Sequence, residues 1–278
     1  KDYDLMFDSG VISSTIIKEL IKANDINKLD EYYRDFDIYF IIWVGLDDNE
    51  VVRKMLVLNA GQKQVSKVHQ FELLFLHIWD EIKKNSKIHI LREKDAKAFS
   101  VKKGEKEVGE FMFSSVIVSM MSLIERKPLR VATENLITED FDEPDSELYQ
   151  KVFRQPFVDK FLNNLFNLDS SITAKESNYG KSWFVKDTTL SGFFAAVGNF
   201  INISSNWTNE ELESKVDKAI QNLDKLITAE GLNLIDFKNE YDSFSSRNVN
   251  IGNHIRKVIA YHIEEVLKGS NPLWKDSF

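Results

Sequence analysis

The pattern of apolar and polar positions changes near residue 105. Before it, short apolar runs rich in β-branched and aromatic residues are bounded by turn-forming clusters, which predicts strands at Tyr3–Phe7, Phe36–Val44, Ile88–Leu91 and Ala98–Val101. Amphipathic helices are predicted from Ser13 or Ser14, over Asn49–Leu58 and from Ser66 through Ile82. This first region therefore combines strands with helices.

After residue 105 the apolar positions recur at about one helical turn. This predicts five helices, at Phe111–Ile124, Ser146–Phe166, Thr188–Phe200, Glu210–Ile227 and Asn250–Leu267. The predicted fold class is α+β, in which a mixed sheet with helices precedes a mainly α-helical region. We predict two domains, at residues 1–104 and 105–278.

The helix predicted at Thr188–Phe200 contains the small residues Gly192, Ala195, Ala196 and Gly198 beside aromatic ones. Small side chains let helix axes approach closely. We expect this helix to pack tightly in the core or against another subunit, rather than to bind a ligand.

Composition narrows the class of protein. The chain has 278 residues, 43% of them hydrophobic, which is sufficient for a substantial core. It has no cysteine, which excludes disulfides, thiolate metal sites and cysteine nucleophiles and favours an intracellular, bacterial, cytoplasmic protein. The net charge of -8 provides no general attraction to nucleic acid or to anionic membranes, so any contact with DNA would be local.

The two most apolar windows, Ile38–Val44 and Phe111–Ile124, are shorter than the roughly 20 residues that cross a bilayer. We therefore predict no membrane association. Residue 1 is Lys and no signal-peptide pattern follows, so we expect the natural N-terminus to lie upstream.

The stretch Met55–Phe75 holds the main candidate site. An apolar run leads into a polar turn that contains Gly61, and Ser66 then caps an amphipathic helix whose first turns carry His69. Polar side chains at such a junction are typical of binding sites. The site residues predicted in this stretch are Asn59, Gly61, Gln62, Lys63, Gln64, Ser66 and His69.

This stretch resembles the DGQHR-type and related ParB-like domains of bacterial phage-defence and DNA-modification systems. Their Asn-containing turn is matched by Asn59, Gly61, Gln62, Lys63, Val65 and Ser66, and the resemblance covers roughly residues 1–92. It implies that the predicted N-terminal sheet is ParB-like, and that the protein binds nucleotide or DNA in antiviral defence.

The second hallmark of that family, an Asp-Gly-Gln-(His/Gln)-Arg turn, is matched here only by Asp8-Ser9-Gly10. Either the motif has decayed, or a loop between Gly10 and Val11 is missing from this sequence. Asp8 is included in the predicted site. The absent Arg weakens the case for nucleoside triphosphate hydrolysis, because developing phosphate charge needs cationic partners, and Lys63 is not a geometric substitute for Arg.

A second cluster, Arg247 to Gly252, leads into a helix that carries Arg256. The N-terminus of that helix could meet a phosphate through Arg247 and Arg256, although Asn250 as a simple N-cap explains the pattern equally well. The histidines lack the i, i+4 spacing of ligands on one helix, so we predict no metal site. We assign no cofactor and no catalytic residue.

Two functions remain open. The first is a DGQHR-type defence protein that binds nucleotide or DNA, with nucleoside triphosphatase or nuclease-associated activity left undecided. The second is a non-catalytic subunit of a defence complex, whose helical region binds a partner protein or a second copy of the chain.

Overall fold

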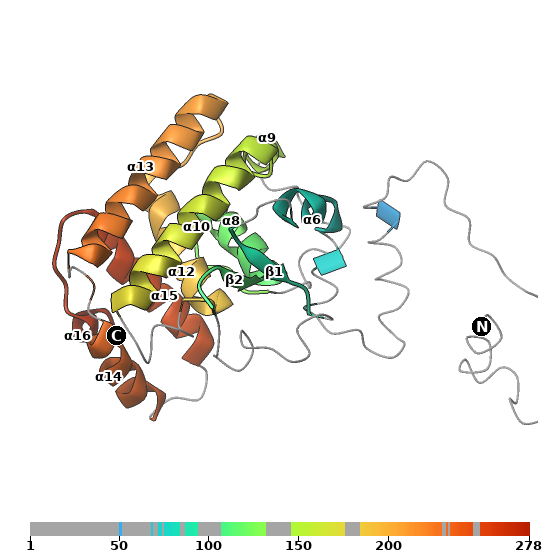
Figure 1. The fold of residues 1–278 in the computed structure, drawn as a ribbon. Helices are drawn as coiled ribbons and strands as arrows, with labels where there is room; N and C mark the ends of the chain where they lie inside the picture. Colours follow the sequence, from blue (N-terminus) through green and yellow to red (C-terminus); the bar gives the residue numbers. More distant parts are fainter. Residues whose placement is uncertain are drawn as a thin grey trace, which may run out of the picture. The chain divides into compact units, whose positions relative to one another are not determined.

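The structure is a computed structural model of the chain (Figure 1). It describes residues 50–51, 68, 72–73, 75–83, 87–93, 107–131, 146–175, 184–229, 232, 234–246 and 251–278. All of these residues belong to one compact unit, Asp47–Phe278.

Most of the described residues are helical. In chain order, the elements are α6 (Leu76–Lys83), β1 (His89–Leu91), β2 (Glu110–Met112), α8 (Phe113–Glu125), α9 (Ser146–Val152), α10 (Gln155–Lys175), α12 (Asp187–Ile201), α13 (Asn209–Thr228), α14 (Leu234–Ser245), α15 (Ile251–Leu267) and α16 (Trp274–Ser277).

The predicted fold class, an N-terminal ParB-like mixed sheet with helices followed by a helical region, is wrong. The sheet in the described part of the chain consists of two short parallel strands, β1 and β2, within a mainly helical structure. The strands predicted at Tyr3–Phe7, Phe36–Val44 and Ala98–Val101 lie outside the described residues, whereas the strand predicted at Ile88–Leu91 is confirmed as β1. The described strands have three residues each, and β2 forms where helical periodicity was predicted, because strand pairing depends on contacts between separate segments that a local pattern does not contain.

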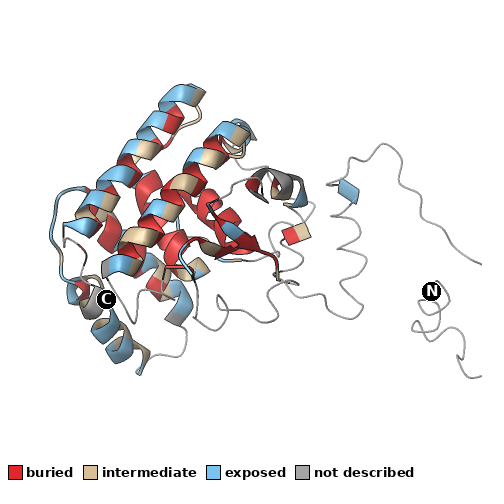
Figure 2. Cartoon of the chain, in the orientation of Figure 1, coloured by how far each residue is buried: buried red, intermediate tan, exposed pale blue. Residues whose placement is uncertain are grey.

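The core is built around α12, which packs against α8 and α15 and also contacts α13. The interior faces of these helices are buried (Figure 2). A Cβ atom on Gly198 would lie 2.1 Å from the carbonyl oxygen of Leu123 in α8, so only glycine fits at this crossing. The prediction that the small residues of this helix serve close packing is confirmed.

The helices predicted after residue 105 are confirmed, except that Phe111 and Met112 belong to β2 and that one predicted helix is divided. The predicted helix Ser146–Phe166 consists of two helices, α9 and α10, separated by Phe153 and Arg154. Pro156 is the second residue of α10, where its missing N–H costs nothing, but its ring would clash with a helix that continued from α9. Two further helices, α14 and α16, were not predicted.

The two strands are parallel and in register, with Ile90 opposite Phe111. They join residues on either side of the predicted domain boundary at 104, and the division into domains 1–104 and 105–278 stays a prediction. Gly109 precedes β2 with a φ of 90°, a conformation that glycine adopts without strain. Its N–H donates to the Oδ2 atom of Asp169 on α10 at 2.8 Å, which anchors the sheet to the helices.

We expect Asp169→Ala to lower the free energy of unfolding by about 2 kcal/mol, because the buried N–H of Gly109 loses its acceptor. Urea unfolding followed by circular dichroism measures this loss. Asn167→Ala, at an exposed position of the same helix, is the control and should change stability by less than about 0.5 kcal/mol. Equal stability of the two variants would contradict the anchoring role.

Candidate functional site

The structure describes one of the site residues predicted from the sequence, Arg256. The other predicted residues lie outside the described part of the chain, so their arrangement stays a prediction; they are Asp8, Asn59, Gly61, Gln62, Lys63, Gln64, Ser66, His69 and Arg247.

Arg256 lies in the second turn of α15, where its guanidinium is already paired. Its Nη2 atom donates to the Oδ2 atom of Asp187 at 2.6 Å, and its side chain is 12% exposed. Asp187 is the first residue of α12. Arg256 therefore joins α15 to the beginning of α12, and a phosphate at its Nη2 atom would have to displace the carboxylate of Asp187.

A buried ion pair lies beside β1. The side chain of Glu72 is completely buried, its Oε2 atom is 3.6 Å from the Nε atom of Arg92, and its Oε1 atom accepts the N–H of Glu93 at 2.8 Å. Burial raises the pKa of Glu72, whereas the N–H of Glu93 and the charge of Arg92 oppose the increase. Arg92 also lies 5.7 Å from the ring centroid of Trp79.

Buried ionisable pairs are common in active sites, but they also occur in structural networks. The carboxylate of Glu72 has no exposed surface, so a substrate could not reach it without opening the packing around α6. The contacts of Glu72 connect its own segment with the end of β1. This geometry is that of a structural contact.

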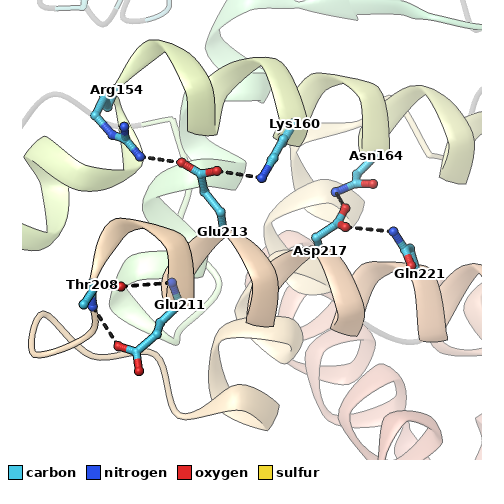
Figure 3. A network of polar contacts seen from close by, with 8 residues as sticks. All are labelled: Arg154, Lys160, Asn164, Thr208, Glu211, Glu213, Asp217 and Gln221. Carbon is cyan, nitrogen blue, oxygen red and sulfur yellow. Dashed lines mark hydrogen bonds and ion pairs between the residues drawn. The ribbon is translucent and has the colours of Figure 1, made fainter.

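A series of polar contacts joins α10 to α13 (Figure 3). Lys160 contacts Glu213, Asn164 contacts Asp217, and Ser171 contacts Asp224, and each pair is separated by the same 53 residues. A constant separation means that the two helices run in the same direction, as Figure 1 also shows. We call these contacts the α10–α13 polar ladder.

Glu213 makes two ion pairs at one end of the ladder. Its carboxylate is paired with the guanidinium of Arg154 and, at 2.6 Å, with the Nζ atom of Lys160. The carboxylate side chain is only 10% exposed, whereas those of Arg154 and Lys160 are 36% and 53% exposed. The buried anion is thus neutralised by two cations that also contact water.

The start of α13 is fixed by a capping box at the same end of the ladder (Figure 3). The hydroxyl of Thr208 accepts the N–H of Glu211 at 3.2 Å, and the carboxylate of Glu211 accepts the N–H of Thr208 at 2.9 Å. These reciprocal bonds satisfy two N–H groups that a helix start leaves without partners. The cap and the ladder together determine where α13 begins along α10.

We expect Glu213→Ala to lower the free energy of unfolding by about 1–2 kcal/mol, because two cations lose their partner but remain hydrated. Chemical denaturation in low salt measures the effect, which should shrink as salt is added. The control is Ser214→Ala, at the next and exposed position of α13, which should hardly change the free energy of unfolding. A salt-independent loss would argue against the ion pairs as its cause.

His262 of α15 is a further buried polar residue, only 1% exposed. Its ring is stacked on Trp274 with centroids 3.5 Å apart, and its Nδ1 atom lies 3.0 Å from the Oγ atom of Ser277. Burial lowers the pKa of His262 to about 4. The imidazole is therefore neutral at pH 7, a form that suits a packed aromatic environment.

The described part of the chain contains no group of three or more His, Asp or Glu side chains that could hold a metal ion. Within the same residues, no helix has the length and hydropathy needed to cross a bilayer. The polar groups found there connect one helix or strand with the next. As arranged, they can fix packing and register.

Comparison with protein-family models, curated proteins and solved structures gave no match to this chain. The resemblance of residues 59–66 to DGQHR-type domains therefore stays a prediction.

Four buried polar residues were not predicted from the sequence: Glu72, Asp169, Glu213 and His262. Such residues leave a signal in the sequence where a polar residue replaces an apolar one in a helical stripe. Glu72 has the spacing of Val68 and Trp79, and His262 that of Ile255 and Ile259. Asp169 has that of Leu162, Leu165 and Ile172. The sequence does not show the partners of these residues, which come from other segments of the chain.

Proposed function

We propose that this chain is a non-catalytic protein-interaction subunit whose helical region is the binding scaffold. The observation that carries the proposal is the ion pair between Arg256 and Asp187 at 2.6 Å. This ion pair occupies Arg256, which is the one predicted phosphate-binding residue in the described part of the chain. A helical body held together by internally paired charges fits a scaffold better than a catalytic centre.

The partner class in this proposal is a protein, either a second copy of the chain or another subunit. The setting is the one that the sequence resemblance implies, a bacterial anti-phage complex in the cytoplasm. That setting depends on residues 59–66, whereas the role as a scaffold depends on the helical region.

The first experiment is a measurement of mass in solution, alone and after purification from the native host. We expect the chain to form a stoichiometric complex with itself or with another protein. Charge reversal on the exposed positions of α13, Lys218→Glu with Lys225→Glu, should then reveal whether that helix contributes to the contact. A monomeric chain that copurifies with no partner would contradict the proposal.

The second candidate function is nucleotide or DNA binding by the turn at residues 59–66, and the pattern Asn59, Gly61, Gln62 and Lys63 favours it. Titration of the chain with ATP, GTP and short DNA tests it directly. Binding that is lost in Asn59→Ala with Gln62→Ala, but kept in Arg256→Lys, would support this site. Absence of binding by the folded chain would eliminate it.

A further inference from the structure

Residues 272–278 pack against an aromatic surface of α14 and α15. Trp274, the first residue of α16, is 1% exposed, and its ring is stacked on His262 at an interplanar angle of 9°. Ser277 contacts the same imidazole through its hydroxyl. One histidine of α15 therefore makes both a stacking contact and a polar contact with this segment.

Aromatic rings of α14 complete the surface. Phe237 meets Trp274 edge-on, with ring centroids 4.7 Å apart, and lies 5.9 Å from Phe278. Phe244 also contacts Phe278, at 5.7 Å, and is stacked on His254 of α15 at 4.3 Å. Trp274 and Phe278, four residues apart, are the two anchors of the segment.

Several features limit how firmly this segment is held. α16 has only four residues, and the indole Nε1 atom of Trp274 is buried with no hydrogen-bond partner among the described residues. A buried donor without a partner destabilises the docked position of the segment. The connection at residues 268–271 is exposed, and Gly269 within it has a φ of 87° and no neighbour near its Cβ position.

We propose that residues 272–278 form a pH-sensitive latch that leaves the aromatic surface of α14 and α15 when His262 takes up a proton. The docked segment removes the imidazole from water, so the ring gains a proton readily only after Trp274 has moved away. Acid therefore favours the open state by mass action.

Burial by itself accounts for the low pKa of His262, which is about 4. Within the described part of the chain, no ion pair involves the ring: Lys275 and Asp276 of α16 are exposed, and Lys238 of α14 pairs with Asp242 at 2.6 Å. On the side of α12, Asp187 pairs with Arg256. The indole of Trp274 and the hydroxyl of Ser277, which contact His262, do not titrate in this range. The other imidazole of the aromatic surface, His254, contacts Phe244 and Phe278.

The size of the effect follows from the two pKa values of His262. With an ordinary value of 6.5 in the open state and about 4 in the docked state, the ratio of open to docked latch rises about 30-fold between pH 8 and pH 5. The rest of the helical body is expected to stay folded over this range.

A spin label on Lys275→Cys measures the open fraction. Lys275 is exposed on α16 and the chain has no other cysteine, so the label is unique. We expect a mobile component in the electron paramagnetic resonance spectrum that grows as pH falls from 8 to 5, with unchanged far-ultraviolet circular dichroism. His262→Gln in the labelled chain should abolish this growth.

Nuclear magnetic resonance of the His262 ring provides a second test that needs no label. The apparent pKa of the wild-type ring should lie between the docked value of about 4 and the open value of 6.5, and in Trp274→Ala it should rise toward 6.5. Three results would each overturn the latch: a pH-independent mobile component in the wild-type background, an equal pH response in His262→Gln, or a ring pKa that stays near 4 in a folded Trp274→Ala variant. Loss of helical structure together with latch opening would do the same.

Discussion

Gly198→Ala is expected to lower the free energy of unfolding by about 3 kcal/mol or more. The new Cβ atom would lie 2.1 Å from the carbonyl oxygen of Leu123, far inside contact distance, so α8 and α12 would have to move apart. Both helices are almost fully buried along their facing sides, and their separation would disturb the centre of the core. Urea unfolding with two-state analysis measures the loss.

The matched control is the same substitution in another helix. Gly252 of α15 is exposed, and among the described residues a Cβ atom there would meet the Nη1 atom of Arg256, at 3.5 Å. Because alanine has the higher helix propensity, Gly252→Ala should be neutral or stabilising by up to about 1 kcal/mol. A Gly198→Ala variant as stable as Gly252→Ala would mean that α8 and α12 do not cross as closely as described.

Acid is expected to remove about 3 kcal/mol of stability through His262. The folded-state pKa of about 4 lies below the unfolded-state value of 6.5, so the unfolded chain binds the proton first as pH falls. The contribution is fully present above pH 6.5, decreases between pH 6.5 and about 4, and is absent below that range. Denaturant unfolding at pH 7, 5.5 and 4.5 follows the loss.

His262→Gln separates the effect of this group from that of Glu72, whose raised pKa acts in the opposite direction. The stability gap between wild type and His262→Gln should narrow by about 2 kcal/mol from pH 7 to pH 4.5. Ser277→Ala removes a hydrogen bond but leaves the buried ring, so it should keep the wild-type pH slope. If the free energy of unfolding of His262→Gln fell with pH as steeply as that of the wild type, other groups would cause the acid sensitivity.

The helical periodicity of the second region was sufficient to locate its long helices. Apolar residues such as Leu212, Val216 and Leu223 recur at the spacing of one helix face, and that face is buried in α13. Element boundaries were predicted less well. Phe111 and Met112 were assigned to the following helix, whereas they pair with Ile90 and Leu91 in the sheet, a contact between separate segments that a local pattern does not contain.

The candidate site was predicted from local chemistry alone. That reasoning could select Arg256 as a cation near a helix start, but it could not show that Asp187, 69 residues away in sequence, holds its guanidinium. The same limit applies to His262, which gains its stacking partner Trp274 only through the packing of α16. Charge and hydrogen-bonding capacity are sequence properties, whereas the pairing of those groups depends on distances in the fold.

The sequence by itself determined the mainly helical second region, the position of strand β1 and the close packing at Gly198, because these follow from periodicity and side-chain size. The tertiary structure decided that the described sheet has only two strands and that α10 and α13 run in parallel with a polar ladder. It also decided which ionisable side chains are buried. Burial and pairing arise when distant segments meet, and a single residue type does not specify its eventual neighbours.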